Sequence, residues 1–415
     1  MNASAFGRDR QVQGFIACAA FSRAGDAAWT VALIWTAVHL ASPATAGAVL
    51  AAGTIPRALV LLYGGVVADR VDSLRLLRIT NLACATVLGV LAVVAWTSGL
   101  TVPVLVLGAV LFGIADALAN PALSTVPRQL VAPEELAEYS GVSLGVQRTG
   151  AMIGAALGGI LVATWDAGVG AAVDAVSFLA MAGLLAVVRP RYPLSRSTGG
   201  SAWQGIVAGF RHLAESPATR TVVLSLMGLN LAVDPALDLG IGLRASHQDW
   251  GAHAVGFSEA LFGVGAILGS LVMVRIKPRR IGLWGFGPMV AQGLAIMALG
   301  YGGRAFLFGV CVLIGLLVGA SSVSLNALFQ TVVDQAYLGR MSAIQSLGDD
   351  VFMPVANVGF GGLAGVSMAT PFVVFGAAMA AVMSLALGRP AIRGARMPDA
   401  DPQDEAGEEQ PAPTG

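Results

Sequence analysis

Charged residues are scarce in this 415-residue chain: they make up 12% of it, against roughly 25% in soluble globular proteins. Hydrophobic residues account for 56%, and the formal net charge is zero. A soluble chain of this length would need more charge on its surface, and the lack of a basic excess argues against nucleic-acid binding. The composition indicates an integral membrane protein whose surroundings are the lipid bilayer.

Cysteine and histidine are also sparse. Cys18, Cys84 and Cys311 lie in apolar runs without CxxC spacing, and the four histidines form no ligand motif, which argues against a disulfide framework or a metal cluster. The chain shows no nucleophile–base arrangement or HExxH motif, and it has no GxxxxGK[ST] phosphate loop for ATP hydrolysis. We therefore expect no enzymatic activity, no catalytic residues, no metal and no cofactor.

Long apolar runs are abundant by contrast. A bilayer core about 30 Å thick is crossed by about 20 apolar residues in a helix. Runs of this kind predict an all-α integral membrane protein with about twelve transmembrane helices in two series of six. The first series covers 12–40, 45–68, 76–97, 102–125, 140–164 and 169–188, and the second covers 220–243, 254–275, 281–300, 305–329, 341–365 and 368–388.

The polar segments divide the chain into four parts. Residues 1–188 form the first six-helix half and residues 220–389 the second. The linker 189–219 is cytoplasmic in this scheme, and its end has apolar residues at helical spacing, which predicts an amphipathic helix at the membrane surface. Residues 390–415 are acidic and rich in proline and glycine, a composition typical of a disordered tail.

Basic residues are distributed unequally between the predicted loops. Nineteen of the 24 lie on the side shared by both termini, only Arg244 and Arg304 lie on the other side, and Arg23, Arg57 and Arg148 lie within spans. The positive-inside rule therefore places both termini in the cytoplasm. Arginine outnumbers lysine 23 to 1, which suggests a GC-rich bacterial genome and hence the bacterial inner membrane.

The loop after the second predicted helix carries Gly65, Asp69 and Arg70 in the pattern Gly-x-x-x-Asp-Arg. This pattern resembles the signature of the major facilitator superfamily at its usual place between helices two and three. The resemblance implies twelve helices in two halves, transport by alternating access, and a gate at the cytoplasmic side formed by these three residues.

A second resemblance lies in the fifth predicted helix. Arg148, Gly154 and Gly158 are similar to the helix-five signature of exporters in the superfamily, with Ala155 where a proline is usual. We therefore expect these three residues at a helix-five interface. Across most of its length the chain most resembles the branch that holds enterobactin exporters and macrolide-efflux-like proteins, which implies efflux by antiport.

Ionisable side chains within membrane spans are costly and are usually functional. We assign six of them to a central cavity with a role in proton coupling: Arg23, Asp26, Arg57, Asp116, Asp234 and Asp238.

Two roles are open for these six side chains. The four in the first half could neutralise one another in a structural network. Alternatively, a carboxyl group that alternates between a dry site and contact with an arginine could carry a proton. Asp26, which has Arg23 beside it, and Asp234, which has no basic residue in its own span, are the candidates for that role.

These patterns favour a secondary active transporter that exports a small amphipathic organic molecule, such as a drug, a siderophore or a secondary metabolite. The proton is the coupling ion, and one chain suffices as a monomer. Two alternatives remain open: an importer or facilitator of a small metabolite, and a non-transporting membrane sensor or scaffold.

Overall fold

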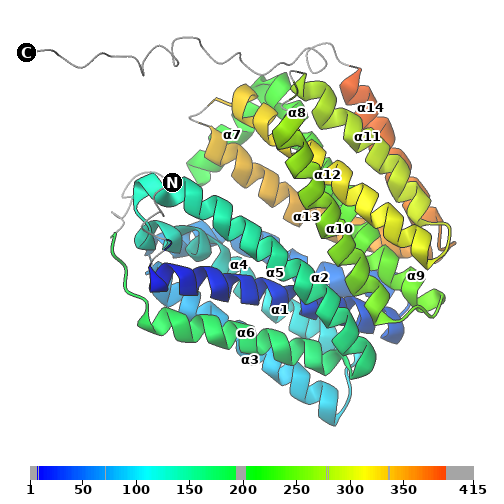
Figure 1. Ribbon diagram of the computed structural model, residues 1–415, viewed down its shortest axis with the longest axis horizontal. Coiled ribbons are helices and arrows are strands. Elements are labelled where there is room, and N and C mark those ends of the chain that lie inside the picture. The colour runs from blue at the N-terminus through cyan, green and yellow to red at the C-terminus, as the bar shows by residue number, and fades with distance from the viewer. Residues whose placement is uncertain are drawn as a thin grey trace, which may run out of the picture.

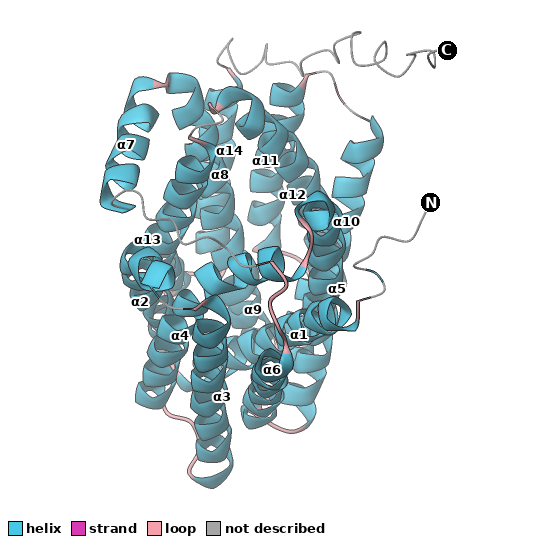
Figure 2. Ribbon diagram, turned by 90° about the vertical axis from the view of Figure 1, so that its left-hand side faces the viewer, coloured by secondary structure: helices cyan, strands magenta, loops and turns pink. Residues whose placement is uncertain are grey.

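The computed structural model describes Gly7 and residues 9–70, 72–192, 202–276, 278, 280–334 and 337–388. All regular structure in these ranges is helical, which confirms the all-α prediction (Figure 2). The first six helices are α1 (Arg10–Leu40), α2 (Pro43–Arg70), α3 (Ser73–Thr97), α4 (Val102–Leu130), α5 (Leu136–Thr164) and α6 (Ala167–Val187). A short 3₁₀ turn, η2 (Pro133–Glu135), precedes α5.

The second series begins after α7 (Ala202–Glu215). Its first helix is composite, with α8 (Pro217–Pro235), the π-helix η3 (Ala236–Gly240) and α9 (Ile241–His247) following one another directly. It continues with α10 (Ala252–Ile276), α11 (Ile281–Leu299), α12 (Arg304–Val332), α13 (Leu338–Ala364) and α14 (Thr370–Leu387). The Ser/Gly-rich part of the linker at 195–201 and the predicted tail at 390–415 lie outside the described residues.

Within the described ranges, nine helices are long and apolar enough to cross a membrane by length and composition. The other three long helices, α1, α2 and α13, carry charged residues in their middle, among them Asp26, Arg57 and Asp350. The count of twelve spans therefore remains a prediction for these three helices.

Polar side chains in the loops define where several helices begin. Asp9 accepts a hydrogen bond from the backbone N–H of Gln11, and Asp72 accepts one from that of Arg75, both at 2.9 Å. Asp166 likewise caps α6. Each cap satisfies a backbone donor that the first turn of a helix leaves free.

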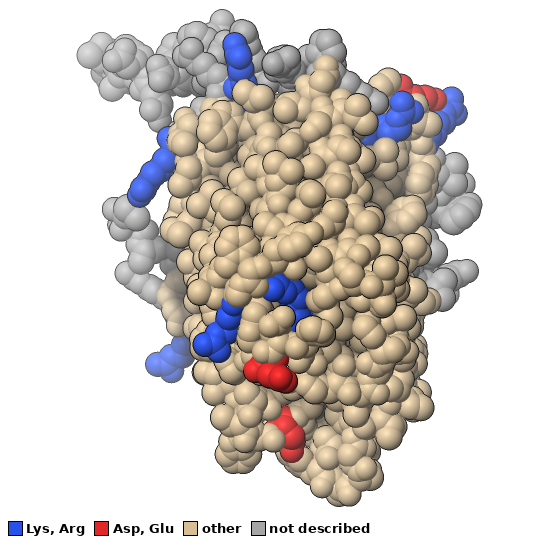
Figure 3. Space-filling model, turned by 90° about the vertical axis from the view of Figure 1, so that its right-hand side faces the viewer, with Lys and Arg blue, Asp and Glu red and all other residues tan. Residues whose placement is uncertain are grey.

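The outer surface of the helices is apolar. Large side chains such as Leu107, Trp165 and Leu385 are exposed, and uncharged residues make up most of the face shown in Figure 3. A soluble protein rarely exposes so much contiguous apolar area, whereas lipid tails are a matching solvent for it.

The helices form two bundles that meet as a V (Figure 1). In the first bundle α1 packs on α5 and α6, and α3 packs on α4 and α6; in the second, α12 packs on α10 and α11, and α14 packs on α11. The bundles contact each other mainly through α2 with α13 and through α5 with α10. They diverge toward the end near the N-terminus and α7 and converge near α9 (Figure 1).

The closest approaches between the bundles lie at the end near α9. A Cβ added to Gly256 of α10 would collide with the carbonyl oxygen of Ala155 in α5, and one added to Gly361 of α13 would collide with that of Pro43 in α2. Two pairs of backbones therefore touch at this end, and they close the V there.

Small residues also bring helices together within each bundle. Gly265 and Gly269 of α10 face Gly315 and Gly319 of α12 so closely that a Cβ on any of them would meet the backbone of the other helix. In the first bundle, Gly154 and Gly158 of α5 lie against Ala24 and Ala28 of α1 in the same way. Both predicted helix-five glycines thus hold α5 against α1, and Ala155 and Gly159 face α10 instead.

We expect Gly154→Ala to lower the free energy of unfolding by about 1–3 kcal/mol, the usual cost of overpacking a tight contact. The added Cβ would collide with the backbone of Ala24. Gly145→Ala on the same helix is the matched control, because no described atom lies within 4 Å of its added Cβ. Unfolding of both variants in mixed micelles measures the difference; equal stability of the two would contradict close α1–α5 packing.

Arg244 has a structural role that its predicted place in an outer loop did not suggest. It is only 4% exposed, and its guanidinium donates to the carbonyl oxygens of Leu299, Tyr301 (3.0 Å) and Gly302 (2.6 Å). It also lies over the ring of Trp250, 5.2 Å from its centroid. Arg244 thereby caps the C-terminal end of α11, where carbonyl groups have no partner within the helix.

Candidate functional site

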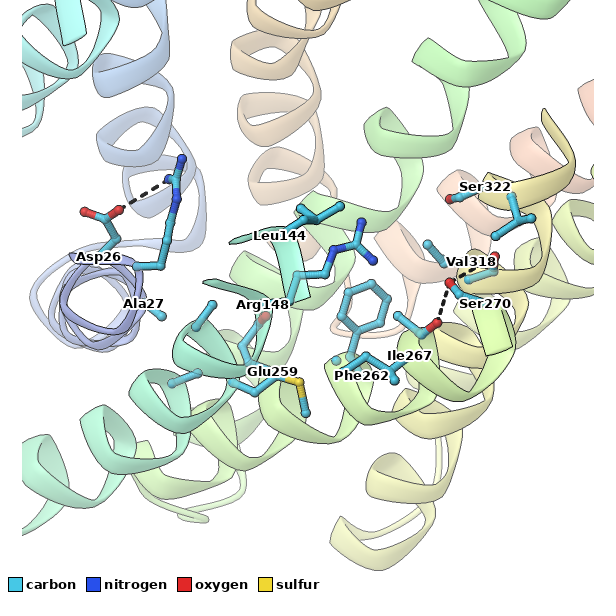
Figure 4. A pocket seen from close by; sticks show the side chains of 18 of the residues that line it. Asp26, Ala27, Leu144, Arg148, Glu259, Phe262, Ile267, Ser270, Val318 and Ser322 are labelled. Carbon is cyan, nitrogen blue, oxygen red and sulfur yellow. Dashed lines mark hydrogen bonds and ion pairs between the residues drawn. The ribbon is translucent and has the colours of Figure 1, made fainter. Parts of the chain in front are cut away.

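A cavity of about 960 Å³ lies between the two bundles, lined by α1 and α5 on one side and α10 and α12 on the other (Figure 4). Its volume is at the upper end of the range for small-molecule sites, which is about 300–1,000 Å³. It reaches from Ala27 and Val31 in the middle of α1 to Leu144 near the start of α5 and Gln330 near the end of α12. The cavity therefore extends toward the end of the molecule at which the bundles diverge.

The walls of the cavity are mostly apolar, with one polar strip. Met152, Phe262 and Ile267 are among the apolar side chains. The polar strip follows α12, whose contribution includes Ser322, Asn326 and Gln330, and Ser270 of α10 lies opposite it. A few polar groups in an apolar concavity are typical of sites that bind small organic molecules.

Arg23 and Asp26 form an ion pair on the wall contributed by α1. Nη1 of Arg23 lies 3.4 Å from Oδ2 of Asp26, as their spacing of three residues predicts. The other carboxyl oxygen, Oδ1, is buried and has no hydrogen-bond partner among the described residues. The site can therefore hold the carboxyl group of Asp26 either ionised or protonated. Arg23 stabilises the ionised form, and Oδ1 is free to take a proton.

Arg57 links the two bundles. Its Nη1 lies 3.0 Å from Oδ2 of Asp116 in α4, and its Nε lies 3.3 Å from Oδ1 of Asp350 in α13. The four charges of the first half thus form two ion pairs, Arg23–Asp26 and Arg57–Asp116, and Arg57 also pairs with Asp350 of the second half. Arg57 and Asp116 are also absent from the wall of the cavity, since Arg57 points into the α2–α13 interface.

The predicted stripe of Asn230, Asp234 and Asp238 also lies away from the cavity wall. Asn230 donates to Asp349 at 2.9 Å, and the carboxyl group of Asp238, in the π-helix, is hydrogen-bonded to that of Glu259. Asp234 and Asp238 are not among the residues that line this cavity, and this face of the composite helix packs on α10 and α13. Their predicted role in proton coupling stays a prediction.

In addition to Asp26, one other carboxyl group lines the cavity in the described residues, that of Glu259 in α10. Its sequence position suggested only a place near the outer end of a helix, yet it is the one acidic residue of α10. Its Oε1 is buried without a hydrogen-bond partner in the described part of the chain. A hydrogen bond between two carboxyl groups requires a proton on one of them, so the Asp238–Glu259 pair is a place where a proton can be held.

The two signature motifs have different outcomes. Gly65, Asp69 and Arg70 lie in the last two turns of α2, but side chains at 61–70 lie outside the described part, so the cytoplasmic gate remains a prediction. Arg148 lines the cavity instead of joining the contact between α5 and its neighbours (Figure 4). Nothing in the described ranges groups three or more His, Cys, Asp or Glu side chains as a metal site.

Two helical bundles that meet at one end and enclose a cavity between them have the architecture common among transporters built from two repeated halves. The chain belongs to the Major Facilitator Superfamily, whose sequence profile matches residues 15–356. The predicted family and fold class are thereby confirmed.

Individual relatives agree with this assignment. The enterobactin exporter EntS of Escherichia coli O1:K1 / APEC is 27% identical over 294 residues, which cover 68% of either chain. The same values hold for EntS of Escherichia coli O157:H7 (strain EC4115 / EHEC). Among solved structures, a D-xylose-proton symporter superposes with a TM-score of 0.72 at 13% identity over 93% of this chain and 99% of its own. The nucleoside transporter NupG gives 0.68 at 14% over 91% and 98%, and both show the fold alone.

Proposed function

We propose that the protein exports a small amphipathic organic molecule across the bacterial inner membrane in exchange for protons. The observation that carries the proposal is the cavity itself: its walls are largely apolar, and it contains the protonatable groups Asp26 and Glu259. The similarity to EntS, an enterobactin exporter by its name, supports the outward direction. The whole cavity is formed by one chain, so a monomer suffices.

The direction of loading follows from the shape and from the charge distribution. The cavity extends toward the end at which α1 begins, and the excess of basic loop residues supports a cytoplasmic location for that end. The opposite end is closed by the α5–α10 and α2–α13 contacts. In this state the cavity would receive its ligand from the cytoplasm, and rocking of the bundles would then expose it to the outside.

Proton coupling rests on Asp26. As the bundles rock, the access of water to Asp26 changes. The carboxyl group is protonated in one state, and in the other it releases the proton and forms the ion pair with Arg23. The Asp238–Glu259 pair on the opposite bundle could hold a second proton. A carrier that must release a proton before it takes up its substrate converts the proton gradient into export.

The test uses inside-out membrane vesicles that contain the protein and are energised to an acidic lumen. A panel of amphipathic compounds is added, and a pH-sensitive dye reports the lumen. We expect compound-dependent loss of lumenal acidity, absent from vesicles without the protein. Accumulation of a compound that requires no gradient would indicate a facilitator, and movement of protons together with the compound would indicate import; either result would overturn proton-coupled export.

A further inference from the structure

One cation on the cavity wall has no partner among the described residues. Four ionisable side chains line the cavity: Arg23, Asp26, Arg148 and Glu259. Arg23 is paired with Asp26, and Glu259 shares a proton-bearing hydrogen bond with Asp238. Within the described part of the chain, the guanidinium of Arg148 has no ion pair and no hydrogen bond. Arg148 is therefore the ionisable side chain of the cavity wall that has no partner within the described part of the chain.

The position of Arg148 does not account for this charge by itself. It lies twelve residues after the start of α5 at Leu136, about 18 Å along a helix that rises 1.5 Å per residue. Long basic side chains snorkel to the interface only near helix ends. The side chain of Arg148 is exposed within the cavity and is not covered by protein. The guanidinium is therefore available to an anionic group that enters the cavity with a ligand.

The surroundings of Arg148 indicate the rest of the ligand. In Figure 4 its side chain extends from α5 into the space that Phe262, Ile267 and Ser270 border from the other bundle. An apolar or aromatic body fits against such walls, and a guanidinium is suited to a planar or forked oxyanion, to which it donates two parallel hydrogen bonds. A phosphate or a halide alone would leave most of the apolar wall uncovered.

We infer that the cavity binds amphipathic organic anions, with Arg148 as the counterion of the anionic group. The inference rests on the proposed transport function and specifies its substrate class: an apolar or aromatic skeleton bearing a carboxylate, a sulfonate or a phenolate-type oxygen. A cationic group at the same position is disfavoured, because it would lie beside the like charge of Arg148.

Binding is tested with two fluorescent probes that share one aromatic skeleton. 1-Anilinonaphthalene-8-sulfonate carries a sulfonate, and N-phenyl-1-naphthylamine lacks it. The whole protein is placed in nanodiscs of zwitterionic phosphatidylcholine, so that no anionic lipid competes, and empty nanodiscs provide the background. We expect Arg148→Gln to weaken sulfonate binding by about tenfold or more, the effect of losing a charge-assisted hydrogen bond, and to change binding of the neutral probe less than about twofold.

Two further variants make the result specific. Arg148→Lys keeps the charge and should retain most of the anion binding, whereas Arg304→Gln removes an exposed arginine at the start of α12, outside the cavity, and should have no effect. Equal weakening of both probes in Arg148→Gln, or equal binding of both to the intact protein, would overturn the inference. Because binding needs no gradient, absence of proton-coupled transport would overturn the proposed function while leaving this result intact.

Discussion

Replacing Arg57 with glutamine is expected to abolish transport and to lower the free energy of unfolding by about 1–2 kcal/mol, between the values for exposed and for buried ion pairs. The intermediate value applies because the side chain of Arg57 is 38% exposed and solvent screens its charge. The variant removes the cation that Asp116 and Asp350 share. Unfolding in mixed micelles measures stability, and uptake by inside-out vesicles measures transport.

Neutralising the two acidic partners separates the loss of charge balance from the loss of the link. Asp116→Asn combined with Asp350→Asn in the Arg57→Gln background should recover most of the stability, because no carboxylate then lacks its cation. Transport should stay low, since the connection between α2 and α13 is still weakened. Arg304→Gln, an exposed charge, should change stability by less than about 0.5 kcal/mol. Full stability of Arg57→Gln would show that the bridge does not hold the bundles together.

Much of the fold could be predicted from the sequence because membrane thickness imposes a length on each helix. The predicted range 76–97 corresponds to α3, and 281–300 corresponds to α11. The π-helix at Ala236–Gly240 could not be predicted in this way. It follows Pro235, which has no N–H to donate, and its extra residue per turn depends on how the composite helix packs on its neighbours.

The candidate site was predictable only where its contacts are local. Arg23 and Asp26 meet because residues three apart share a helix face. The Arg57–Asp350 pair joins helices from opposite ends of the chain, and no periodicity indicates which face of α13 meets α2. Glu259 was underestimated for the same reason: helical spacing gives its height in the membrane, whereas its direction toward the cavity depends on the α10–α12 packing.

Asp26→Asn is expected to reduce compound-dependent proton release in the vesicle assay at least about tenfold, since general acid–base groups commonly contribute 10²–10⁴-fold to proton transfer. The amide has the size of the carboxyl group and still faces the cavity, but it cannot take up and release a proton. Binding of the neutral probe N-phenyl-1-naphthylamine should persist, because the apolar wall is unchanged. The variant would therefore bind its ligand and fail to couple.

Asp166→Asn is the matched control for this substitution. Asp166 caps α6 and does not line the cavity. Because asparagine is as good a cap as aspartate, proton coupling and stability should both be unchanged. Undiminished proton release in Asp26→Asn would move the coupling role to the opposite bundle. Glu259→Gln would then be expected to abolish release, because Glu259 carries the other carboxyl group among the described residues that line the cavity. Proton coupling is thus assigned to the bundle whose carboxyl group, Asp26 or Glu259, abolishes proton release when it is replaced by its amide. The ligand must then contact that bundle in order to displace the proton from this carboxyl group.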